Sequence, residues 1–143
     1  MSDIGMILQR IGAKLVTDVA PKLEGDYSAG HASMSGMMSV MAGEMWDKQA
    51  DLLIHEVTRL EALLSTGGVK VENAQPESFR ISDLTAKRNE LAALLVDLQA
   101  ELEERDDEEA RALNEQVWGH LLATSAARMP SPPVFAGADE EDA

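Results

Sequence analysis

The sequence predicts an all-α fold, an up-and-down bundle of three to four helices with one long helix over about residues 28–65. Apolar residues recur at steps of three and four along most of the chain, which places them on one face of a helix. Only 3% of the residues are aromatic, so the core must be built from Leu, Ile, Val, Ala and Met. The prolines lie between the periodic segments, where a helix must end.

The first predicted helix has an apolar stripe and ends before Pro21. The long helix that follows has two different halves. In its first half, methionines fall within an arc of about 100° and small residues occupy the opposite side, so both faces need partners. The second half narrows to a single apolar seam. The stripe is Ile4, Leu8, Ile11, Leu15 and Val19; the arc is Met34, Met37, Met38, Met41 and Met45; the small face is Ala29, Ala32, Gly36, Val40 and Gly43; the seam is Trp46, Ala50, Leu53, Val57, Leu60 and Leu64.

Residues 66–82 predict a loop, because Gly67 and Gly68 stop the long helix and Pro76 forbids another. Val69 and Val71 alternate within it and indicate a short extended piece laid across the bundle. After this loop, apolar periodicity returns and continues to residue 127. Its inner positions are Leu84, Arg88, Leu91, Leu95, Leu98 and Leu102, followed by Ala110, Leu113, Val117, Leu121 and Thr124.

Two interpretations of residues 83–127 stay open. We prefer a tight turn near Asp106, with a fourth helix from about Asp107, because Asp106 and Glu109 have capping-box spacing. The alternative is one continuous helix over residues 83–127, because no Gly or Pro lies near the proposed turn. Either way, the sequence predicts a helical domain over residues 1–128 and a Pro-rich acidic tail over residues 129–143.

The charge and composition exclude several classes of protein. A formal net charge of -14 repels phosphate backbones and anionic membranes, so we expect no nucleic-acid or membrane partner. The 17 residues from Tyr27 to Gly43 lack charged side chains but are too short and too polar for a membrane span. The absence of cysteine excludes disulfides and thiolate metal sites. The N-terminus does not resemble a signal peptide, so we expect a cytoplasmic protein.

One row of side chains on the long helix has the chemistry of a weak ligand site. Glu44, Asp51 and His55 point the same way within about 40°, and Asp51 and His55 form an i, i+4 pair that could hold a divalent metal if another helix added ligands. His31, near the start of the same helix, could lie beside a cavity. A solvated helix edge with a weak Asp–His pair is the simpler interpretation.

Known catalytic and cofactor motifs are missing from the sequence. No histidine has a glutamate three residues before it, which argues against a di-iron carboxylate bundle. There is no phosphate-binding loop and no nucleophile elbow, and we expect no cofactor. His120, beside the inner face of the last helix, is expected to be a hydrogen-bonded core residue.

These observations favour an interaction protein over an enzyme. The two-faced helix over residues 28–46 predicts a homodimer with that helix at or near the interface. The methionine arc or the PPVF segment would supply apolar contact, and the acids at 101–109 and 139–142 would steer the protein toward a basic partner surface. The alternative is a metal- or small-ligand-binding bundle with its site near His31, Glu44, Asp51 and His55.

Two short runs resemble a known group of proteins. The run VAPKLEGDY at residues 19–27, Glu44, and the run HEVTRLEALL at residues 55–64 are similar to a group of small uncharacterised bacterial helical-bundle proteins. The likeness covers about the first half of the chain and consists of scattered positions. It implies a bacterial cytoplasmic protein that is accessory to a metabolic enzyme, and it implies no activity and no site residues.

Overall fold

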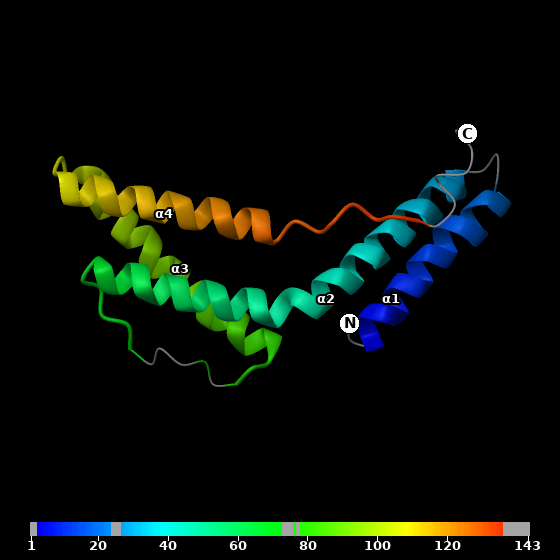
Figure 1. Ribbon diagram of the computed structural model, residues 1–143, viewed down its shortest axis with the longest axis horizontal. Helices are drawn as coiled ribbons and strands as arrows, with labels where there is room; N and C mark the ends of the chain where they lie inside the picture. Colours follow the sequence, from blue (N-terminus) through cyan, green and yellow to red (C-terminus); the bar gives the residue numbers. More distant parts are fainter. Residues whose placement is uncertain (1–2, 24–26, 73–75, 77, 136–143) are drawn as a thin grey trace. The chain divides into compact units, whose positions relative to one another are not determined.

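The computed structural model describes residues 3–23, 27–72, 76 and 78–135. These residues contain four α-helices and no strand, which confirms the all-α bundle and its long helix (Figure 1). A π-helical turn, Leu15–Val19, and a 3-10 turn, Ala20–Leu23, follow the first helix. The four helices are α1, Asp3–Lys14; α2, Tyr27–Thr66; α3, Ile81–Glu104; and α4, Glu108–Ala127.

The chain divides into two compact units, and the division lies inside α2. The first unit contains residues 1–48 and 130–143, and the second contains residues 49–129. The sequence assigns residues 1–128 to one domain, whereas the structure divides that segment at Lys48 and Gln49. Helix α2 therefore contributes its first half to one unit and its second half to the other.

Leucine side chains from three helices form the core of the second unit. Leu60 and Leu64 of α2 and Leu84 and Leu91 of α3 are at most 1% exposed. Burying one such side chain contributes about 1.5–3 kcal/mol. The predicted leucine positions of α3 are therefore confirmed. The core cluster is Val57, Leu60, Leu63, Leu64, Leu91, Leu95, Leu98, Leu102, Ala110, Leu113 and Val117.

Gly68 ends α2 in the left-handed region of the backbone, with a φ of 77°. The amide of Gly68 donates to the Ser65 carbonyl at 3.0 Å, and the amide of Val69 donates to the Leu64 carbonyl at 2.9 Å. These two bonds make a Schellman motif, in which glycine avoids the strain that a Cβ would add. Val69 and Val71 then pack against the leucine core. The predicted helix stop is confirmed, and no strand forms in the described part of this loop.

The chain turns between α3 and α4, so the preferred interpretation is confirmed and the continuous helix is wrong. The N-cap is Asp107, one residue after the predicted Asp106: its carboxylate accepts from the Ala110 amide at 2.9 Å. Arg105 donates to both carboxylate oxygens of Asp107, at 2.8 and 3.0 Å, and these bonds lower the pKa of Asp107. The cap therefore stays negatively charged at the positive end of the helix dipole.

In the first unit, α1 lies against the first half of α2 and meets it through glycines (Figure 1). A Cβ placed on Gly36 would lie 2.7 Å from the carbonyl oxygen of Gly12, and one on Gly43 would lie 2.6 Å from that of Gly5. Side chains do not approach backbone oxygens so closely, so only glycine permits this separation of the helix axes. The small face of the long helix therefore packs on α1 of the same chain.

The apolar stripe predicted for the first helix packs only in part: Leu8 and Leu15 lie at the contact with α2, whereas the isoleucines do not. Ile4 and Ile11 are 47% and 49% exposed, because α1 turns its glycines toward α2. The Ser39 hydroxyl donates to the Leu8 carbonyl at 2.8 Å across the same contact. The seam predicted from Trp46 begins later, since Trp46 is 52% exposed and the first buried seam residue is Leu53.

The glycine contact gives a matched pair of substitutions. Gly12→Ala should destabilise the first unit by about 1–3 kcal/mol, because the new methyl meets the Gly36 carbonyl oxygen and Val40. Gly30→Ala, on α2 in open space, should leave stability unchanged or raise it by up to about 1 kcal/mol through helix propensity. Amide hydrogen exchange of α1, measured on both variants, checks this. Equal protection in the two variants would contradict the close contact.

Candidate functional site

The four residues predicted as ligand candidates all lie on α2 and fall in different units. His31 and Glu44 belong to the first unit, where thirteen residue steps along the helix place them about 20 Å apart, too far to share one ion. Asp51 and His55 belong to the second unit. His31 makes an edge-to-face contact with Tyr27, with 4.6 Å between the ring centroids. Among the residues that the structure describes, no three His, Asp or Glu side chains could hold a metal together.

Glu44 holds a segment of the chain that lies far away in sequence. Its carboxylate accepts from the Ser131 amide at 2.9 Å and from the Ser131 hydroxyl at 2.8 Å, and it pairs with Lys48 one turn along α2. Lys48 and then Ser131 lower the pKa of Glu44 to about 2. Glu44 thus acts as an anchor for residues 130–135, which run beside the first half of α2 (Figure 1).

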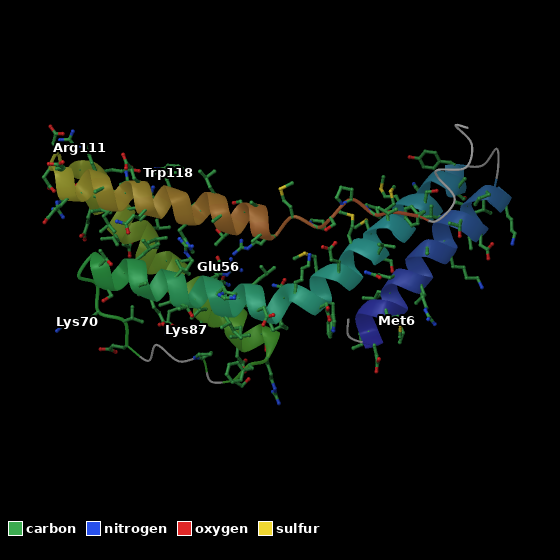
Figure 2. The ribbon with its side chains drawn as sticks, in the orientation of Figure 1. Met6, Glu56, Lys70, Lys87, Arg111 and Trp118 are labelled. Carbon is green, nitrogen blue, oxygen red and sulfur yellow. The ribbon has the colours of Figure 1, made fainter. Side chains whose placement is uncertain are left out.

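In the second unit, a buried carboxylate stands among arginines. Glu56 is 8% exposed and accepts two hydrogen bonds of 2.5 Å from Arg128, which caps the C-terminus of α4. Arg88 of α3 lies 4.0 Å from the same carboxylate. Figure 2 places Glu56 between α2 and α4, with side-chain nitrogens around it. The leucine core brings these groups together, because 72 residues separate Glu56 from Arg128 in the sequence.

His120 lies beside this cluster and is 1% exposed. Burial lowers its pKa; Glu56 opposes that shift, and Arg59 and Arg128 add to it. Its Nδ1 atom is buried without a hydrogen-bond partner in the described part of the chain. His120 is therefore a core residue, as predicted, although its Nδ1 makes no hydrogen bond within the described residues.

A pocket opens between α2 and α4 next to Glu56. Its volume is about 290 Å³, close to the lower limit of about 300 Å³ for typical small-molecule sites. Aliphatic groups of Leu52 and Ala127 line it, together with His55, Arg59 and Arg128. Of the four predicted ligand candidates, only His55 borders this pocket.

Large apolar side chains are exposed on both helices of the first unit. Tyr27 lies at the start of α2, and the methionine arc is only partly covered. Trp46 lies near the middle of α2, and we call the exposed apolar side chains of these two helices together the hairpin face. It comprises Ile4, Met6, Ile7, Ile11, Met34, Met37, Met38 and Trp46, with exposed fractions of 39% to 64%.

Sequence reasoning missed the cluster around Glu56. Glu56 directly precedes the seam residue Val57, and a charged residue beside an apolar seam is a signal that could have identified it. Arg88 gives the same signal, because it is a charged residue within the predicted leucine heptad of α3. No pattern in the sequence relates Arg128 to either residue.

Comparisons with known proteins add nothing to this geometry. No protein family, no curated protein and no solved structure matches the chain. Within the described residues, none of the helices combines the length and the apolar character that crossing a bilayer requires.

The buried His120 predicts a pH dependence of stability. Because the pKa of His120 in the folded chain lies below the ordinary value of 6.5, there is a pH range in which the unfolded chain binds a proton at His120 and the folded chain does not. The free energy of unfolding should therefore fall from about pH 7.5 to about pH 5.5, with a slope of at most about 1.4 kcal/mol per pH unit from this residue. His120→Leu should remove this contribution. Urea unfolding of both proteins across that range isolates it, and two parallel curves would contradict it.

The anchor at Glu44 predicts a second, more acidic transition. Its bonds to Ser131 are complete above the ordinary pKa of 4.5 and are lost as the pH falls through about 2. Glu44→Ala should remove the exchange protection of the Ser131 amide at every pH. Glu44→Gln, which keeps an acceptor oxygen, should retain part of that protection near neutral pH. An amide equally protected in wild type and Glu44→Ala would refute the anchor.

Proposed function

We propose that this chain is a small, non-enzymatic cytoplasmic interaction protein that works as a homodimer through the hairpin face. One observation supports this most directly. The buried residues in the described part of the first unit are Gly5, Gly12, Ala20, Gly36 and Gly43, so the unit buries no side chain larger than a methyl group.

A helix pair of this kind lacks a hydrophobic core of its own. Burial of large apolar side chains is the main stabilising contribution in folded proteins, and glycine contacts do not supply it. Packing two helix pairs together produces a four-helix bundle, in which the outward apolar residues become the core. Exposed apolar patches of this type mark interaction surfaces.

The distribution of charge favours a second copy as the partner. Residues 1–48 contain four basic and six acidic residues, a net charge of -2, although the whole chain has a net charge of -14. Two hairpin faces can therefore meet with less repulsion than the rest of the chain would cause. Twofold symmetry would place the same apolar residues on both sides of the contact. The charged residues of this segment are Arg10, Lys14, Lys22 and Lys48 against Asp3, Asp18, Glu24, Asp26, Glu44 and Asp47.

The second unit offers a different surface, which fits a basic protein partner. Exposed acids surround the turn between α3 and α4, and attraction to a basic surface would weaken with salt. The predicted acids at 139–142 lie outside the described residues. The acids around the turn are Glu103, Glu104, Asp106, Glu108 and Glu109.

The dimer predicts a specific effect of one charge on the hairpin face. The wild-type protein should sediment as a dimer at micromolar concentration. Ile7→Lys should raise the dissociation constant at least about 100-fold, because a buried unpaired ammonium costs several kcal/mol. Val96→Lys is the matched control: Val96 is 66% exposed on α3, and this variant should remain dimeric.

Analytical ultracentrifugation of the three proteins tests the proposal. A monomeric wild type would refute it, as would an Ile7→Lys variant that associates as tightly as the wild type. Far-UV circular dichroism of each variant separates a loss of association from a loss of folding.

A further inference from the structure

The pocket between α2 and α4 combines an apolar wall with a positively charged rim. Leu52, Ala123 and Ala127 supply the wall. Arg59 and Arg128 supply guanidinium groups at its edge. A chain with 26 acidic and 12 basic residues would be expected to surround an arginine with acids, so this local excess of positive charge is unusual.

Glu56 does not neutralise this excess. Its carboxylate takes both hydrogen bonds from Arg128 and also faces Arg88 at 4.0 Å. Arg59 has no ion-pair partner among the described residues. The Nε atom of Arg88 is buried without a partner there as well. In the pocket lining, one carboxylate therefore stands with two guanidinium groups, which leaves room for another negative charge.

We propose that this pocket binds a small monocarboxylate with an apolar tail. The carboxylate pairs with the Arg59 guanidinium, a planar donor that matches its two oxygens. The tail lies against Leu52, Ala123 and Ala127. Glu56 sets the charge of the ligand, because a second negative charge deeper in the pocket would meet its carboxylate.

This site is independent of the proposed dimer. Every residue that lines it belongs to the second unit, whereas the hairpin face belongs to the first. The sequence offered, as an alternative function, a small-ligand site near His31, Glu44, Asp51 and His55. The proposed pocket would be such a site, but of these four residues only His55 borders it.

Three probes of six carbons each, hexanoate, hexan-1-ol and hexylamine, test the charge requirement on the full chain. Hexanoate should bind, with amide chemical-shift changes at Ala123 and Ala127. Hexan-1-ol and hexylamine should bind at least about ten-fold more weakly, because neither carries a charge that pairs with Arg59. Adipate, which adds a second carboxylate, should also bind at least about ten-fold more weakly than hexanoate.

Matched variants test the residues. Arg59→Gln should weaken hexanoate at least about ten-fold, and Arg111→Gln, at an exposed arginine of the same chain, should not. Ala127→Phe should fill the pocket and abolish binding. Urea midpoints equal to wild type in each variant show that the fold is intact.

Several results would overturn the site. One is equal affinity for hexanoate and hexan-1-ol, and another is unchanged hexanoate binding in Arg59→Gln. Shift changes that inorganic phosphate alone reproduces would show a general anion contact instead of a carboxylate pocket. The absence of any shift at the highest soluble hexanoate concentration would refute it outright.

Discussion

The leucine contact between α2, α3 and α4 is the constraint on which the second unit depends. It aligns residues far apart in sequence, and only then can Arg128 reach Glu56. A buried ion pair of this kind adds little net stability, because desolvating the two charges offsets their attraction. The leucines, at about 1.5–3 kcal/mol each, therefore supply the stability that lets a charged cluster persist beside the core.

Helix α2 packs by two different mechanisms along its length. In the first half, Gly36 and Gly43 bring the backbone of α1 close, which gives tight contact with little room for large side chains between the helices. In the second half, Leu60 and Leu64 enter a core of ordinary size. One continuous helix can serve both, because glycine is tolerated inside a helix at a cost of about 1 kcal/mol. The result is a self-sufficient second unit and a first unit whose apolar side chains remain outside.

The sequence predicted the helices well and the polar sites poorly. Periodicity identified the buried leucines from Leu84 to Leu102, because a leucine heptad places one face of a helix against the core. Gly67 and Gly68 correctly marked the end of α2, because glycine commonly follows the last turn of a helix. The face of α1 was predicted only in part, because apolar periodicity found Leu8 and Leu15 but cannot detect a contact made by Gly5 and Gly12. Long-range pairs such as Glu44 with Ser131 were beyond prediction, because no local pattern encodes a partner 87 residues away.

The uneven distribution of charge connects the two proposals. Twenty of the 26 acidic residues lie outside residues 1–48, so in the proposed dimer the hairpin face would meet its copy with less repulsion than the rest of the chain would cause. Association through that face would give orientation as well as affinity. In a chain with so many carboxylates, a cluster in which Arg88 and Arg128 share the one carboxylate of Glu56 is the exception. The pocket beside Glu56 keeps its positive charge within an acidic protein, and an anionic ligand accounts for that exception in physical terms.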